Sequence, residues 1–96
     1  MHGDAVRFQK IDELRRYVHE RICHQNELEM NVFDVTERML VRGGRPCGIF
    51  FCLHGPRSVK FTAIWETEQN RILFYGSTGE RLQRINLEAS PVLGCS

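Results

Sequence analysis

The chain has 96 residues, and this length predicts a single domain, spanning 1–96, with one hydrophobic core. Hydrophobic residues make up 42% and charged residues 26% of the sequence, a composition that is typical of globular proteins and argues against disorder. The formal net charge of +1 gives the chain no overall attraction to nucleic acid or to a membrane surface.

The N-terminal part is predicted to be an amphipathic helix over about 8–28. Hydrophobic side chains recur at spacings of three, four and four residues, which places them on one helical face: Ile11, Leu14, Val18 and Ile22. The polar segment "HQNELEMN" is expected to end the helix, and residues 1–6 are expected to be a frayed start.

After the helix, the hydrophobic period changes to two, and β-branched and aromatic residues become frequent. We expect a β-meander over about 34–87, with strands near 34–42, 46–53, 58–66, 70–76 and 80–87. The short connections contain glycine, proline and polar residues, so each neighbouring pair of strands is predicted to form an antiparallel hairpin. The tail 88–96 has no periodicity and is expected to be loose.

Matching the hydrophobic faces of neighbouring strands predicts two hairpin registers. If "HGPRS" forms a five-residue loop, Leu53 lies opposite Val59 and large apolar side chains pair across the strands. If 67–69 form the tip of the next polar turn, Ile64 lies opposite Ile72.

The predicted fold class is therefore α+β, with the helix packed on a curled five-stranded antiparallel meander. A single helix covers only one face of a sheet, yet these registers predict a second apolar face, which carries Phe50, Cys52, Ile64, Ile72 and Phe74. Closure into a small barrel, a dimer or another protein would bury this face, or it stays exposed as a binding surface. We predict these five residues as an interface.

Two glycine-containing turns, "HGPRS" and "GSTGE", are predicted to share one end of the sheet, because alternate turns of a meander lie at the same end. The candidate ligand-binding residues at this end are His54, Arg57, Ser58, Ser77 and Thr78. An arginine, hydroxyl groups and the exposed backbone N–H groups of such turns can bind a phosphate or another anion. The simpler interpretation is that these residues serve only the turns.

No metal site, cofactor or catalytic group is predicted. His19 with Cys23, and Cys52 with His54, each lie on one face of their element, but no C-x-x-C motif accompanies them. A cysteine within "IFFCL" is typical of an inert core. The sequence contains no motif of a hydrolase, zinc protease or nucleotide-binding loop, so we lean against an enzyme.

Five short strands after a helix resemble, in outline, the Sm-like small barrels that bind RNA. The Sm-type Asp…Asn pattern between the second and third strands is missing here. The outline is also similar to cystatin-like α+β folds, without a motif of that family. The aromatic residues Phe50, Trp65, Phe74 and Tyr75 are candidates for stacking on RNA bases, although the balanced charge disfavours RNA.

The first ten residues have no apolar segment typical of a signal peptide, and no apolar run approaches the ~20 residues that span a membrane. We therefore expect a cytoplasmic protein with reduced cysteines and no membrane partner. The predicted function is a small non-catalytic module that binds protein, foremost a second copy of itself as a dimer. Binding of an anion or phosphate ligand and binding of RNA are the alternatives.

Overall fold

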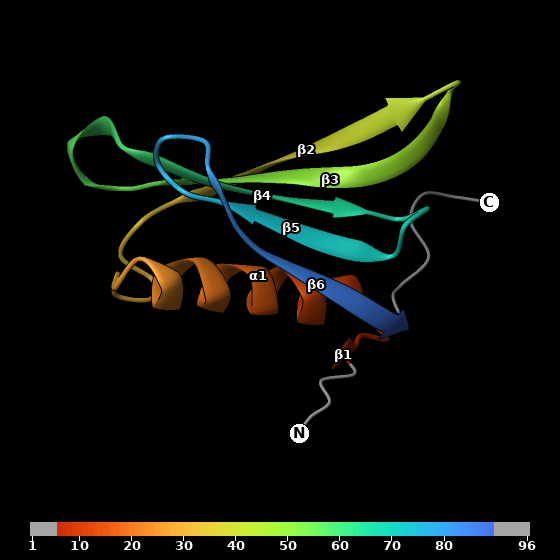
Figure 1. The fold of residues 1–96 in the computed structure, drawn as a ribbon, viewed down its shortest axis with the longest axis horizontal. Coiled ribbons are helices and arrows are strands. Elements are labelled where there is room, and N and C mark those ends of the chain that lie inside the picture. The colour runs from red at the N-terminus through yellow and green to blue at the C-terminus, as the bar shows by residue number, and fades with distance from the viewer. Residues whose placement is uncertain (1–5, 90–96) are drawn as a thin grey trace.

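The computed structural model describes residues 6–89, and in it one helix lies against one face of an antiparallel sheet (Figure 1). The helix is α1 (Ile11–Gln25), and the sheet contains β2 (Val35–Arg42), β3 (Arg45–His54), β4 (Lys60–Glu66), β5 (Arg71–Tyr75) and β6 (Arg81–Ala89). A short 3₁₀ helix, η1 (Pro56–Ser58), connects β3 to β4, and a two-residue strand, β1 (Val6–Arg7), pairs in parallel with β6. The strand order is β1-β6-β5-β4-β3-β2.

The predicted α+β fold, a helix on a five-stranded antiparallel meander, is confirmed. The sheet is not closed into a barrel, because β1 and β2 stand at its two ends and do not pair with each other. Of the expected loose tail, Glu88 and Ala89 belong to β6, while 90–96 lie outside the described residues. Residues 1–5 of the expected frayed start also lie outside them.

Helix α1 packs on the sheet through the stripe that the sequence predicts. Leu14, Val18 and Ile22 are 0 to 1% exposed, while Ile11 at the start of the stripe is only half-buried. Burying a Leu, Val or Ile side chain contributes roughly 1.5–3 kcal/mol each. This stripe therefore determines which face of the helix packs on the sheet.

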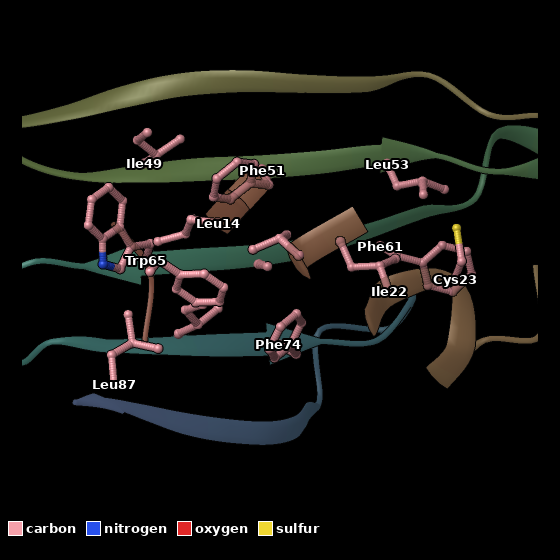
Figure 2. Close-up of a cluster of buried hydrophobic side chains, with 14 residues drawn as sticks. Leu14, Ile22, Cys23, Ile49, Phe51, Leu53, Phe61, Trp65, Phe74 and Leu87 are labelled. Carbon is pink, nitrogen blue, oxygen red and sulfur yellow. The ribbon is translucent and has the colours of Figure 1, made fainter. Parts of the chain in front are cut away.

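The core lies between α1 and the sheet, as Figure 2 shows. Figure 2 labels Leu14, Ile22 and Cys23 of the helix and, from the sheet, Ile49, Phe51, Leu53, Phe61, Trp65, Phe74 and Leu87. The sheet residues alternate along each strand, because successive side chains of a strand point to opposite faces. We call this side of the sheet the helix side.

The β3–β4 connection has the predicted five residues but is displaced by one position. It spans 55–59, with His54 opposite Lys60, so Leu53 lies opposite Phe61 instead of Val59. The pairing moves by two residues, and a shift of two leaves every side chain on its predicted face.

The predicted β4–β5 register is wrong by one residue. The turn contains four residues, 67–70, because Asn70 adopts a left-handed conformation (φ 51°) and its N–H donates to the Thr67 carbonyl at 3.1 Å. Asparagine tolerates this conformation better than most residues. As a result Ile64 lies opposite Leu73, not Ile72.

This shift exchanges the two faces of β5. Ile72 and Phe74, which were expected on the second apolar face, are 0% exposed in the core on the helix side. Leu73 and Tyr75 take their places on the opposite face. Phe50 and Ile64 of the predicted interface do lie on that opposite face, where they are half-buried.

Candidate functional site

The end of β3 and the loop that follows it carry three of the predicted ligand-binding residues. His54 ends the strand, and its Nε2 lies 3.0 Å from the Thr36 hydroxyl of β2. Arg57 and Ser58 are exposed and both have left-handed backbones, with φ of 59° and 64°. This loop therefore presents an arginine and a hydroxyl to solvent.

The loop between β5 and β6 is closed by its own carboxylate. Glu80 accepts hydrogen bonds from the Thr78 hydroxyl and from the Thr78 N–H at 3.2 Å, and the hydroxyl is the larger cause of a pKa of Glu80 below its usual 4.5. An N–H group that could bind an external anion is thus already used. Ser77 is exposed beside it.

Both loops emerge from the same end of the sheet, as predicted (Figure 1). Within residues 6–89, however, no hydrogen bond or ion pair joins His54, Arg57 or Ser58 to Ser77 or Thr78. The anion site at this end stays a prediction, and the Glu80 carboxylate works against it by repelling anions.

The sheet face opposite α1, which we call the open face, has an apolar centre between two arginines. Its middle row crosses the sheet as Arg38, Phe50, Ile64, Leu73 and Arg84, each directly opposite the next. Leu73 is 5% exposed yet lies outside the helix-side core, so side chains of its own face cover it. The row places hydrophobic contact area and positive charge side by side.

Two further five-residue rows lie on the open face. One consists of Thr36, Cys52, Thr62, Tyr75 and Arg81. The other consists of Leu40, Gly48, Glu66, Arg71 and Asn86. The three rows carry four arginines against one glutamate, a formal charge of +3, while the whole chain carries only +1. The positive charge is therefore concentrated on this face.

Three of these four arginines have free guanidinium groups. Arg71 forms an ion pair with Glu66, with 2.6 Å between Nε and Oε1. Arg38, Arg81 and Arg84 are exposed, and their side chains make no ion pair or hydrogen bond with another residue of the described part of the chain.

A shallow depression of about 190 Å³ lies beside this face, near the β2–β3 and β4–β5 turns. Its charged groups are already paired, Arg42 with Glu68 at 3.5 Å and Arg71 with Glu66. It is also smaller than the ~300–1,000 Å³ of typical ligand pockets. We assign it no ligand.

Strand β2 is an uncovered edge, and no described strand lies beyond it. Met39 and Val41 on this strand are 50% and 60% exposed. Both point to the helix side, since Met39 lies opposite the core residue Ile49. An edge strand with exposed apolar side chains is a template for pairing with another strand.

The structure gives no support for a metal or thiol centre. Within residues 6–89, no three His, Cys, Asp or Glu side chains are grouped so that they would hold a metal ion. Cys23 is buried in the core, and burial raises its thiol pKa above 9.0. Cys52 is buried on the open face, 7% exposed.

Sequence reasoning missed two features of the surface: the arginines around the open face and the exposed edge of β2. Arg84 could be placed on the open face only once β5 was assigned to its correct faces. Met39, Leu40 and Val41 follow one another, so the sequence places apolar side chains on both faces of β2. It therefore gave no sign that Met39 and Val41 would stay exposed.

No protein-family model matches the chain, and neither a curated protein nor a solved structure matches it. Within residues 6–89, no helix is both long enough and apolar enough to cross a membrane.

Proposed function

We propose that this protein is a small binding module that self-associates by antiparallel pairing of β2 with β2 of a second copy. The observation that carries the proposal is the unpaired β2 edge with the exposed side chains of Met39 and Val41. Pairing would extend the sheet across both copies and remove both apolar side chains from water.

The backbone of β2 is oriented for such pairing. The N–H of His54 donates to the Asp34 carbonyl at 2.9 Å, so even-numbered residues of β2 bond to β3. Hydrogen bonds alternate along an antiparallel strand, which turns the N–H and C=O groups of Glu37 and Met39 away from β3. These groups supply the new ladder without breaking an existing bond.

The charges of β2 select one register. A two-fold axis through Met39 or through Arg38 pairs seven of the eight residues, 36–42 or 35–41 with themselves, and axes through the other residues of β2 pair fewer. Axes between two residues would set outward-facing groups opposite inward-facing ones, which an antiparallel ladder does not allow. The Arg38 register places Arg38 opposite its own copy, which is destabilising. The Met39 register places Met39 on Met39, Arg38 opposite Leu40 and Glu37 opposite Val41, with no like charges opposed.

The test is sedimentation equilibrium from micromolar to millimolar protein, because an edge contact is smaller than the ~1,600 Å² of a standard interface and predicts a weak dimer. We expect the wild type to dimerise and Met39→Lys, which opposes two ammonium groups at the axis, to stay monomeric. The matched control is Val32→Lys, since Val32 is 58% exposed but lies outside β2. This variant should dimerise like the wild type.

Amide hydrogen exchange adds a residue-level readout. The amides of Glu37 and Met39 should become protected as protein concentration rises, while the Arg38 amide, bonded within the sheet, is protected throughout. A wild type that is monomeric at millimolar concentration overturns the proposal. Dissociation by Phe50→Lys with no effect of Met39→Lys would also overturn it, and would move the contact to the open face.

A further inference from the structure

We propose that the open face binds single-stranded nucleic acid, with bases stacked on Phe50 and Tyr75 and phosphates held by Arg38, Arg81 and Arg84. This inference is independent of the β2 contact, because it rests on side chains of the open face, whereas Met39 and Val41 point to the helix side.

The first support is the composition of the face. Phe50 and Tyr75 are half-buried on β3 and β5, so part of each side chain stays accessible to a ligand. Aromatic rings on a sheet surface are a common platform for unpaired bases, since every base offers a planar face. Trp65 and Phe74, the other aromatic candidates of the sequence, are 0% exposed in the core and take no part.

The second support is the position of the positive charge. Arg38 and Arg84 end the middle row on strands β2 and β6, four strand spacings apart, which is about 19 Å at ~4.8 Å per spacing. Arg81 lies directly opposite Tyr75. Free guanidinium groups on both sides of an aromatic centre suit a chain of phosphates that crosses the sheet.

The third support is that the centre of the open face offers side chains to a ligand but no unpaired backbone groups. The backbone donors of β3, β4 and β5 are used in the sheet, so an extended acidic peptide would find no ladder to join here. Nucleic acid needs none, because its affinity comes from stacking and from phosphate contacts. A duplex is disfavoured, since its paired bases cannot stack on Phe50 or Tyr75.

The probe is a fluorescent oligouridylate of about ten nucleotides, within the footprint of single-strand-binding folds, followed by fluorescence anisotropy. An oligothymidylate of equal length separates RNA from DNA. We expect binding that weakens steeply with salt, because counterions are released. A poly-glutamate peptide is the competitor that detects an acidic protein partner.

Two double variants of equal charge carry the test. Arg38→Gln with Arg84→Gln should weaken binding about tenfold and reduce the salt slope by roughly 1.4, at ~0.7 per lost phosphate contact. Lys10→Gln with Arg16→Gln removes two exposed positive charges from α1 and its N-cap position, on the other side of the sheet, and should leave the affinity within about twofold. Phe50→Leu keeps an apolar side chain and should weaken binding several-fold through lost stacking.

Absence of binding by the wild type at low salt overturns the proposal. Equal losses of affinity in the two double variants would overturn it, because they would show a diffuse charge effect. An affinity of Phe50→Leu equal to that of the wild type would also overturn it, because it would show that no base stacks on Phe50. Binding of poly-glutamate with equal strength would assign the face to an acidic protein instead. Circular dichroism of each variant must match the wild type, and Tyr75→Leu replaces Phe50→Leu if the latter unfolds.

Discussion

Asn70 and Leu87 hold each other through two hydrogen bonds. The Leu87 N–H donates to the Asn70 carbonyl at 2.8 Å, and Asn70 Nδ2 donates to the Leu87 carbonyl at 2.9 Å. Asn70 is also the left-handed residue that ends the β4–β5 turn. The pair therefore ties the turn that determines the faces of β5 to the last strand of the sheet.

Replacing Asn70 should separate its two contributions. Asn70→Gly keeps the left-handed backbone but loses the side-chain hydrogen bond, and should cost about 1 kcal/mol in the free energy of unfolding. Asn70→Ala loses both, and should cost about 2 kcal/mol, since a left-handed conformation costs a β-carbon roughly 1–2 kcal/mol. Urea unfolding measures both values. Equal stability of the glycine and alanine variants would contradict the role of the backbone conformation.

The general fold could be predicted because it depends on periodicity. The stripe of Leu14, Val18 and Ile22 and the alternation within β3 and β4 survive errors of a residue at element ends, since many positions repeat the same signal. The faces of β3 and β4 were also predicted correctly, because the register error between them was two residues and such a shift leaves each side chain on its face.

The faces of β5 could not be predicted in this way. They depend on whether Asn70 belongs to the turn or to the strand, and a strand of five residues with three apolar neighbours, Ile72, Leu73 and Phe74, fits either choice. The hydrogen bonds of Asn70 with Leu87 decide the question, and they join residues 17 positions apart. The middle row of the open face depends on the same choice, because Arg84 lies on this face only if Leu73, its partner on β5, does.

The start of α1 predicts a pH dependence. Glu13 accepts hydrogen bonds from the N–H groups of Gln9 at 2.9 Å and Lys10 at 3.4 Å, and these bonds, Gln9 first, hold the pKa of Glu13 below 4.5. A pKa that is lower in the folded state adds stability above the unfolded value and loses it as the pH falls through the folded value. Glu13→Gln should therefore be less stable than wild type at neutral pH.

This difference should shrink below pH 4.5, as the Glu13 carboxylate of the wild type takes up its proton. Thermal unfolding of both proteins from pH 7 to pH 3 measures it. The control is Glu20→Gln, which removes an exposed carboxylate from the middle of the same helix. A difference for Glu13→Gln that stays constant with pH would show that the charge does not cause it.

Gly48 allows β3 and β4 to approach closely. A β-carbon at this position would overlap the Trp65 carbonyl oxygen, so the backbone would have to move. Gly48→Ala should cost about 3 kcal/mol, the upper end of the roughly 1–3 kcal/mol that overpacking a core costs. Gly43→Ala is the control, because Gly43 has φ +59° but a β-carbon there would meet no atom within 4 Å, so this variant should cost only the roughly 1–2 kcal/mol of a left-handed conformation. The reverse order in urea unfolding would contradict this role.

The dimer and the nucleic-acid surface, if both hold, predict a dependence on oligonucleotide length. Antiparallel pairing of identical β2 edges has its two-fold axis perpendicular to the sheet, so both open faces lie on the same side. A strand of about twenty nucleotides could then contact both faces, and one of about ten only one.

Met39→Lys should weaken binding of the longer strand about tenfold or more through lost bivalency, with little change for the shorter one. The added positive charge would by itself strengthen binding, and Val32→Lys, which adds the same charge outside β2, controls for it. Equal changes for both lengths in anisotropy titrations would contradict the joint arrangement, while each separate proposal keeps its own test.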